Sequence, residues 1–209
     1  MNIRAESTDD NQRVPSTTQF VYQAHDLDKP EIIGRVLQAE GVDKVVVFTR
    51  TKRQAQRVAD DLVERGFNAS PLHGDMQQSS REKALSRFRE DKLKVLVATD
   101  VAARGIDVAG VSHVINYTCP EDEKTYVHRI GRTGRAGRTG IAITFVDWAE
   151  VTRWKVINKA LDLNFDEPIE TYSTSPHLFT DLNIPEGTKG RIAQAKAEPA
   201  AAKKERAPR

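Results

Sequence analysis

The stretch DKVVVFTRTKRQAQRVADDLVERGFNASPL, residues 43–72, predicts a strand, a helix and a second strand in succession. KVVVF (44–48) is a continuous apolar run, which is typical of a strand buried on both faces of a sheet. Residues 51–65 carry apolar side chains at helical spacing and are followed by Gly66. ASPL (69–72) then predicts the next strand. This order favours a right-handed crossover between two parallel strands.

The same alternation continues on both sides of that stretch. Further strands are predicted at 20–24, 94–98, 113–117 and 140–146, and further helices at 29–40, 79–90, 121–130 and 148–161. The six strands and their helices predict an α/β fold, a doubly wound parallel sheet with helices on both faces. Because such sheets bind ligands outside the carboxyl ends of their strands, we expect the functional residues in the loops that follow the strands.

The chain divides into three parts by composition. Residues 1–18 are polar and aperiodic and predict a linker, residues 19–165 form the predicted domain, and residues 166–209 predict an irregular to disordered tail rich in Ala, Lys and Pro. Residues 189–209 alone carry a net charge of +5, so the rest of the chain carries −3 of the total of +2. A basic tail favours a polyanionic partner, although many such tails are only solvated.

Composition also excludes several classes of protein. No apolar run in the 209 residues approaches the length of about 18 needed to cross a bilayer, so we expect no membrane segment. The N-terminus lacks the apolar region of a secretory signal. Cys119 is the single cysteine, which excludes a disulfide framework and a cysteine-based metal site. We therefore expect a cytoplasmic protein without a metal site of its own.

Two loops carry the clearest chemical patterns. HRIGRTGRAGR (128–138) repeats arginine every three residues with glycines between them. Glycine lets the backbone approach a ligand closely, and arginine presents a planar fork that matches phosphate oxygens, although a plain basic patch would show the same composition. In TDVAARGIDV (99–108), Thr99 or Asp100 can cap a short helix whose free N–H groups would attract an anion. Asp107 could accept hydrogen bonds from a pair of hydroxyls such as those of ribose, or serve only in a turn.

Two further loops are less specific. FTRTK (48–52) follows a strand, and its hydroxyl and basic residues, Thr49 among them, either contact phosphate or cap the next helix. HGDMQQSSR (73–81) places Gln78 and Arg81 on one face of the first turn of a predicted helix. Taken alone, that spacing does not separate a ligand contact from an ordinary surface position.

In this order, the four segments resemble the C-terminal RecA-like domain of DEAD-box RNA helicases, in helicase superfamily 2. VVVFTRTK (45–52) is similar to motif IV of that family, and the run from Gln78 to Arg81 is similar to its QxxR motif. VATDVAARGIDV (97–108) resembles motif V, and YVHRIGRTGRAG (126–137) resembles motif VI. The resemblance runs from about residue 20 to residue 165, and motifs V and VI match almost letter for letter.

The resemblance implies a set of contacts to ATP. Arg132 and Arg135 are expected to reach the γ-phosphate, with Arg135 as the arginine finger. A cation placed in advance stabilises charge on the transferring phosphoryl group. Asp107 is expected to contact the ribose, and Gly105 to lie close to the same interface.

The resemblance also implies contacts to RNA and between domains. Thr99, Gln78 and Arg81 are expected to contact the phosphate backbone of single-stranded RNA, and Thr49 of motif IV is expected to join them. His128 and Arg129 are expected to lie at contacts between domains, without a direct chemical role.

One departure from the family pattern concerns missing motifs. The sequence contains no G-x-x-x-x-G-K-[ST] phosphate loop and no D-E-A-D tetrad. The family places these parts, which hold most of ATP and Mg²⁺, in an N-terminal RecA-like domain. We therefore expect the chain to be the second half of an ATP-dependent RNA helicase that separates RNA duplexes locally, and to be inactive as an ATPase alone.

Two alternative functions remain open from the sequence. The first is a superfamily 2 motor that acts on DNA, and comparing stimulation by single-stranded RNA and DNA would discriminate it. The second is a non-enzymatic RNA-binding module that uses the QxxR and motif V residues together with the basic tail. A phosphate loop encoded upstream would exclude this second alternative.

Overall fold

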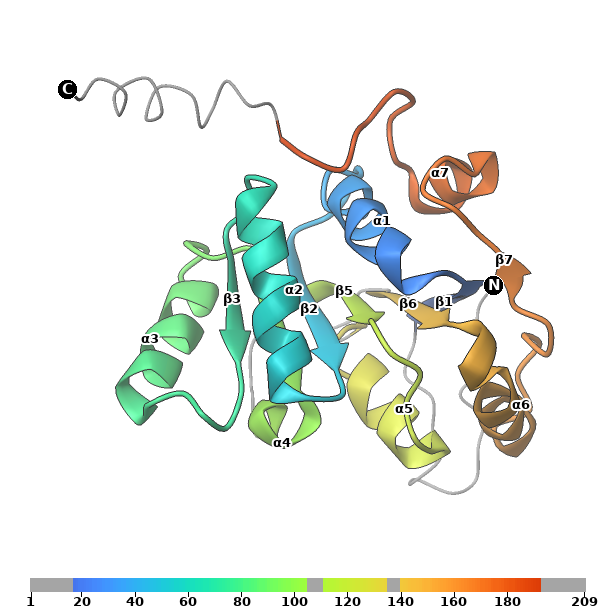
Figure 1. Ribbon diagram of the computed structural model, residues 1–209, viewed down its shortest axis with the longest axis horizontal. Helices are drawn as coiled ribbons and strands as arrows, with labels where there is room; N and C mark the ends of the chain where they lie inside the picture. Colours follow the sequence, from blue (N-terminus) through green and yellow to red (C-terminus); the bar gives the residue numbers. More distant parts are fainter. Residues whose placement is uncertain (1–16, 105–110, 135–139, 193–209) are drawn as a thin grey trace.

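The computed structural model describes residues 17–104, 111–134 and 140–192 (Figure 1). At its centre is a seven-stranded sheet in the order β3-β4-β2-β5-β6-β1-β7, and all of its pairings are parallel. The strands are β1 (Thr17–Gln23), β2 (Lys44–Thr49), β3 (Ala69–Leu72), β4 (Val95–Thr99), β5 (Val111–Asn116), β6 (Gly140–Val146) and β7 (Ile169–Glu170). The parallel α/β fold is therefore confirmed, and all six predicted strands are present.

Helices cover both faces of this sheet (Figure 1). Helices α1, α2 and α7 share an apolar core with one face, whereas α3, α4, α5 and α6 pack on the other. The helices are α1 (Lys29–Val36), α2 (Lys52–Glu64), α3 (Gln78–Arg89), α4 (Asp100–Ala103), α5 (Glu123–Ile130), α6 (Val151–Ala160) and α7 (Pro176–Leu182), with 3₁₀ turns η2 (Asp26–Asp28) and η3 (Trp148–Glu150). This two-sided cover is the RecA-like arrangement that the sequence predicts.

The central strands end level with one another, and this positions the site. Strand β2 is buried along its whole length, as its unbroken apolar run predicts. In the register of the sheet, Phe48 of β2 pairs with Ala98 of β4 and with Asn116 of β5, and Thr49 pairs with Thr99. The loops that follow β2, β4 and β5 therefore start from the same edge of the sheet.

The C-terminal segment is more ordered than the sequence suggests. The predicted irregular tail begins at residue 166, yet strand β7 and helix α7 follow, with Leu178 and Leu182 fully buried against the α1–α2 side of the core. The sequence does not predict these elements, because Pro168 and the low apolar content of the segment favour an irregular structure despite a few leucines at helical spacing. Residues 193–209, and all but the last two residues of the predicted linker 1–18, lie outside the described parts.

After α7, residues 183–192, here called the strap, cross over α1 and α2. The strap packs so closely that a Cβ added to Gly34 of α1 would lie 2.1 Å from the carbonyl oxygen of Gly190. Glycine is therefore required where the strap meets α1, because no larger residue fits between the two backbones. The amide of Ile192 then donates to the carbonyl of Arg65, at the end of α2.

The described parts of the chain contain neither a membrane-spanning helix nor a cluster of metal ligands. No helix there has both the length and the apolar character needed to cross a membrane. Within the same residues, no group of three or more His, Cys, Asp or Glu side chains is arranged to hold a metal ion.

Candidate functional site

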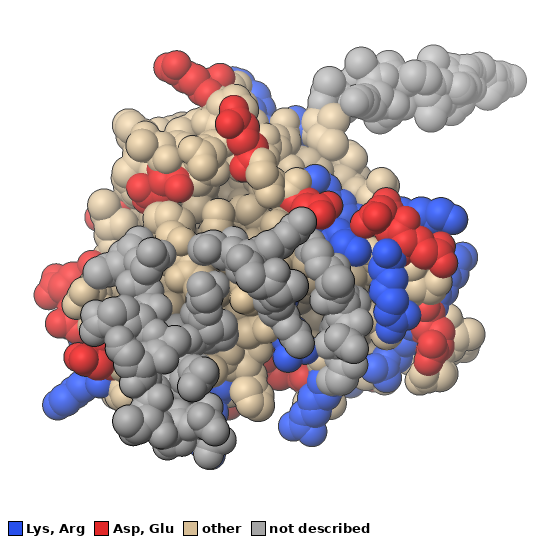
Figure 2. Space-filling model, turned by 180° about the vertical axis from the view of Figure 1, so that it is seen from behind, with Lys and Arg blue, Asp and Glu red and all other residues tan. Residues whose placement is uncertain are grey.

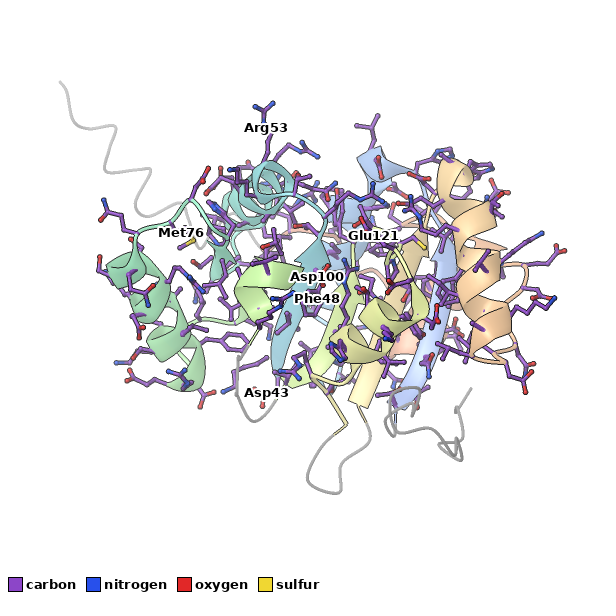
Figure 3. The ribbon with its side chains drawn as sticks, turned by 90° about the horizontal axis from the view of Figure 1, so that it is seen from below. Asp43, Phe48, Arg53, Met76, Asp100 and Glu121 are labelled. Carbon is purple, nitrogen blue, oxygen red and sulfur yellow. The ribbon has the colours of Figure 1, made fainter. Side chains whose placement is uncertain are left out.

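A pocket of about 330 Å³ lies between α4 and α5, above the end of β2. It is lined by Phe48, Asp100, Ala103, Arg104, Thr125, His128, Arg129 and Arg132. Three of these residues are arginines and one is a carboxylate, so the pocket suits an anionic ligand. Figure 3 shows Asp100 and Phe48 next to each other near the middle of the strand ends, with Met76 on one side and Glu121 on the other.

Arg129 of α5 is the buried centre of this site, with only 3% of its side chain exposed. Its Nε and Nη2 donate to the two carboxylate oxygens of Asp100, at 2.8 and 2.9 Å. Its Nη1 donates to the side-chain oxygen of Asn116 and to the carbonyl of Thr118, both at 3.1 Å. The guanidinium also lies 5.3 Å from the ring centre of Phe48. Every nitrogen of Arg129 therefore has a partner inside the domain.

Helix α4 joins the Arg129 cluster to α3. Thr99 is its N-cap, because its Oγ1 accepts a hydrogen bond from the amide of Ala102 at 3.4 Å. The carbonyl of the same Ala102 accepts from Nη2 of Arg81, on α3, at 3.5 Å. The Nε of Arg81 is buried and has no hydrogen-bond partner in the structure. Leaving this buried nitrogen unpaired costs free energy, whereas the rest of the Arg81 side chain is partly exposed and open to an external acceptor.

Arg132 lies one helical turn after Arg129 and is partly exposed at the pocket. The chain around it is tightly held. The hydroxyl of Thr133 donates to the carbonyl of Val111 at 2.6 Å. A Cβ added to Gly140, where β6 starts, would lie 2.1 Å from that same hydroxyl oxygen. The two ends of the glycine-rich loop therefore meet at Thr133, and Gly140 is required there.

The residues predicted to bind RNA differ in their exposure to solvent. Gln78 is exposed at the start of α3 and donates to Glu82 at 2.7 Å, and Thr99 is partly exposed at the start of α4. Thr49 is a correction: it is fully buried, and its hydroxyl donates to the carbonyl of Thr51 at 3.3 Å. Its side chain is therefore not accessible to a ligand, and Arg50, which follows it, is the exposed residue of that loop.

The residues predicted to bind ATP are only partly described. Arg132 lies in the pocket, whereas Gly105, Asp107 and Arg135 fall outside the described residues, and their roles stay predictions. The guanidinium of Arg129 makes all its described hydrogen bonds within this domain, and its predicted place at a contact between domains stays a prediction.

Three residues of the site were missed by sequence reasoning: Asp100 as the partner of Arg129, Asn116 behind it, and Phe48 beneath it. A capping role was considered for Asp100, and Phe48 and Asn116 were assigned only to apolar strands. The available signal was the position of Asn116, a polar residue near the end of a strand that is otherwise buried. A buried amide at that position requires a partner.

Comparison with known proteins identifies the family. The model described as "Helicase conserved C-terminal domain" matches residues 28–137. The chain belongs to this family. The match includes α4, α5 and every residue that lines the pocket. Together with the DEAD-box relatives and solved structures described next, it confirms the relationship to DEAD-box helicases that is predicted from motifs IV, QxxR, V and VI.

Named relatives of this helicase C-terminal domain are DEAD-box proteins. It is 46% identical over 138 residues to the DEAD-box ATP-dependent RNA helicase CshA of Geobacillus kaustophilus. The aligned residues cover 66% of this chain and 30% of that protein. It is 42% identical over 153 residues to CshA of Bacillus subtilis, which covers 73% of this chain and 31% of the relative. The chain thus spans about a third of the length of these curated relatives.

Solved structures agree with this relationship. E. coli DEAD-box protein SrmB, bound to regulator of ribonuclease activity A, is similar with a TM-score of 0.68 and 34% identity, covering 84% of this chain and 98% of that one. S. cerevisiae Dbp5 bound to RNA and ADP BeF3 is similar with a TM-score of 0.68 and 32% identity, covering 80% of this chain and 45% of that one.

Proposed function

We propose that this domain is the C-terminal half of an ATP-dependent DEAD-box RNA helicase and that it contacts ATP and RNA at two sides of the α4–α5 pocket. The observation that carries the proposal is the bidentate pair between Asp100 and Arg129. Asp100 follows Thr99 on the RNA side, and Arg129 precedes Arg132 by one turn on the ATP side. A shift of either helix therefore moves the other.

On the ATP side, the chain supplies cations. Arg132, which lines the pocket, would reach phosphate oxygens at the cleft, and Arg135 would follow it as the proposed arginine finger. Three arginines against one carboxylate in the pocket lining fit a polyphosphate. Asp107, with Gly105 beside it, would receive the ribose hydroxyls.

Mg²⁺ and most of ATP would be held by an N-terminal RecA-like domain of the same protein. Bound there, Mg²⁺ would neutralise charge on the β- and γ-phosphates. Without a phosphate loop, this chain alone would neither position the nucleotide nor hydrolyse it.

On the RNA side, the chain supplies donors to the phosphate backbone. The partly exposed side chains of Arg81 and Thr99 and the exposed amide of Gln78 lie near the starts of α3 and α4. Backbone contacts carry little sequence information, so binding would be general for single-stranded RNA and weakened by salt.

Closure of the two domains would connect these contacts. ATP and RNA would each bind across the cleft, and each would stabilise the closed state through contacts to both halves. By linkage, each ligand would then raise the affinity for the other. In the closed state one RNA strand would be held in a form that its partner cannot pair with, so a short duplex would open locally.

The RNA side is tested by binding of single-stranded RNA to the 209-residue chain. We expect Arg81→Ala to weaken binding about fivefold, because a charge-assisted contact is lost. Arg89→Ala is the matched control, since Arg89 is exposed at the other end of the same helix, and we expect less than about a twofold change.

Salt provides a second readout of the same contacts. Arg81 is the one cation among these three named contacts, so its phosphate contact predicts about a two- to threefold loss of affinity between about 50 and 200 mM salt, and Arg81→Ala should reduce that dependence. Equal effects of the two substitutions, or affinity that does not change with salt, would contradict this placement of RNA.

A further inference from the structure

Three aromatic rings form an exposed stack at a distance from the pocket along the sheet. The rings of His25 and Trp148 stack with centres 4.2 Å apart and planes 16° apart, and the ring of Tyr172 lies 5.8 Å from His25. Trp148 is 45% exposed and Tyr172 40% exposed. We call these three residues the ring platform. Leu27, beside it in sequence, is 97% exposed, so large apolar surface is left in water here.

The ring platform is held in place by its backbone. Asp147 and Glu150 form a reciprocal capping box that fixes the turn containing Trp148. The amide of Tyr172 donates to the hydroxyl of Ser175 at 2.8 Å, and the hydroxyl of Tyr172 donates to Glu170. Rings fixed in this way lose little conformational freedom when a ligand packs on them.

The platform lies outside the proposed ATP and RNA contacts. Its residues follow β1 and β6 and flank β7, which form one end of the sheet order, whereas the proposed RNA contacts follow β2, β3 and β4 at the other end. None of the three rings lines the pocket between α4 and α5. A ligand on the platform would therefore leave the helicase site open.

The segments that carry the rings are acidic, whereas the neighbouring α6 carries Arg153, Lys155 and Lys159. The three segments that carry the rings, residues 23–30, 147–150 and 164–175, contain seven acidic residues and one lysine. That lysine, Lys29, is fully buried and is paired with Asp26 at 2.7 Å. Figure 2 shows acidic side chains predominating on its left, the side of α6 and β7, and basic ones more numerous toward its right. The phosphate backbone of RNA would be repelled here.

We infer that the ring platform is a docking surface for an arginine-bearing basic segment of a partner protein. Arginine fits both features at once, because its guanidinium stacks on aromatic faces and its charge matches the acidic surroundings. Lysine would satisfy the charge but lacks the planar group for stacking. The inference does not depend on the proposed roles of Arg132 or Arg81.

The test uses the 209-residue chain and a short synthetic peptide of alternating glycine and arginine, with binding measured by titration calorimetry. We expect Trp148→Ala to weaken peptide binding about tenfold, because the largest ring of the platform is removed. Val156→Ala is the matched control: Val156 is an exposed apolar residue on the nearby α6, and this substitution should leave affinity unchanged. A lysine version of the peptide should bind about threefold more weakly than the arginine version.

Two competitors separate this surface from other sites. Single-stranded RNA should not displace the arginine peptide from the chain, and displacement would overturn the inference by placing the peptide on the RNA contacts. A peptide copying residues 193–209 should not bind to the platform. If it binds as tightly as the arginine peptide, the occupant is the basic end of this chain rather than a partner protein. Equal affinity of Trp148→Ala and the unaltered chain would also overturn the inference.

Discussion

Two clusters of arginine and carboxylate use the same chemistry at opposite faces of the sheet. At the pocket, Arg129 is buried and holds both oxygens of Asp100, whose side chain remains 45% exposed. On the other face, Glu31 of α1 accepts from Arg65 at 2.6 Å and from Arg35 at 2.9 and 3.0 Å, while the amide of Gly190 donates to it at 2.8 Å.

The difference lies in what each cluster leaves open. The hydrogen-bond partners of Glu31 lie on α1, at the end of α2 and in the strap, so they all belong to this domain. Partial burial alone would raise its pKa, but the hydrogen bonds from Arg65, Arg35 and Gly190 lower the pKa of Glu31 to about 2. Asp100 instead exposes part of its carboxylate at the pocket. The cluster around Glu31, here called the strap cluster, holds the C-terminal segment in place. The pair of Arg129 and Asp100, here called the pocket cluster, joins two parts of the proposed site.

The largest expected effect comes from breaking the pocket cluster. We expect Arg129→Ala to lower RNA-stimulated ATP hydrolysis by more than about a hundredfold in the protein that includes the N-terminal RecA-like domain, because Arg132 loses its support. Arg129→Lys should also be impaired, since lysine cannot replace the fork. Circular dichroism establishes that the variants are folded. Activity within about twofold of the unaltered protein would break the proposed connection between α4 and α5.

The corresponding change in the strap cluster should affect stability and leave activity intact. Arg65→Ala removes the contacts of Arg65 to Glu31, Asp61 and the carbonyl of Gly190. We expect it to lower the free energy of unfolding by about 2 kcal/mol, measured in urea, with hydrolysis within about twofold. A large loss of hydrolysis with unchanged stability would mean that the two clusters do not differ as described.

Acid should weaken the strap cluster through Glu31. Its pKa is lower in the folded than in the unfolded chain, so its stabilisation is complete above about pH 4.5 and is lost as the pH falls toward 2. Because water screens the partly exposed cluster, we expect a contribution of about 1.5 kcal/mol. Glu31→Gln should remove this part of the pH dependence, as measured by urea unfolding at several pH values. An identical pH profile in the variant would show that Glu31 carries no such role.

The smallest expected effect on hydrolysis comes from the contact between α1 and the strap. Gly34→Ala places a methyl group where the backbone of Gly190 now lies. We expect hydrolysis within about twofold but a loss of more than about 2 kcal/mol of stability, because the overlapping atoms are backbone and the strap must move away. The strap should become easier to cleave in limited proteolysis. Gly41→Ala is an informative comparison, since Gly41 has open space but a positive φ of 87°, and should affect stability without exposing the strap.

The sequence predicts the body of this fold well, because β2, α2 and their neighbours follow hydrophobic periods that match the final structure. It fails at the C-terminal segment, where Leu178 and Leu182 are buried by long-range packing that no local pattern reveals. Residues of the predicted motifs V and VI line the α4–α5 pocket. The pairing of Asp100 with Arg129 was not predicted. These residues are 29 positions apart, and they meet only through the register of β4 and β5 on either side of β2.

The most direct test of the central claim is RNA-stimulated ATP hydrolysis by this chain alone and by the same chain joined to an N-terminal DEAD-box RecA-like domain. If the nucleotide site is shared between two domains, hydrolysis will occur only in the joined protein and will depend on Arg132. Hydrolysis by this chain alone would contradict the account, because it would require a complete nucleotide site within these 209 residues.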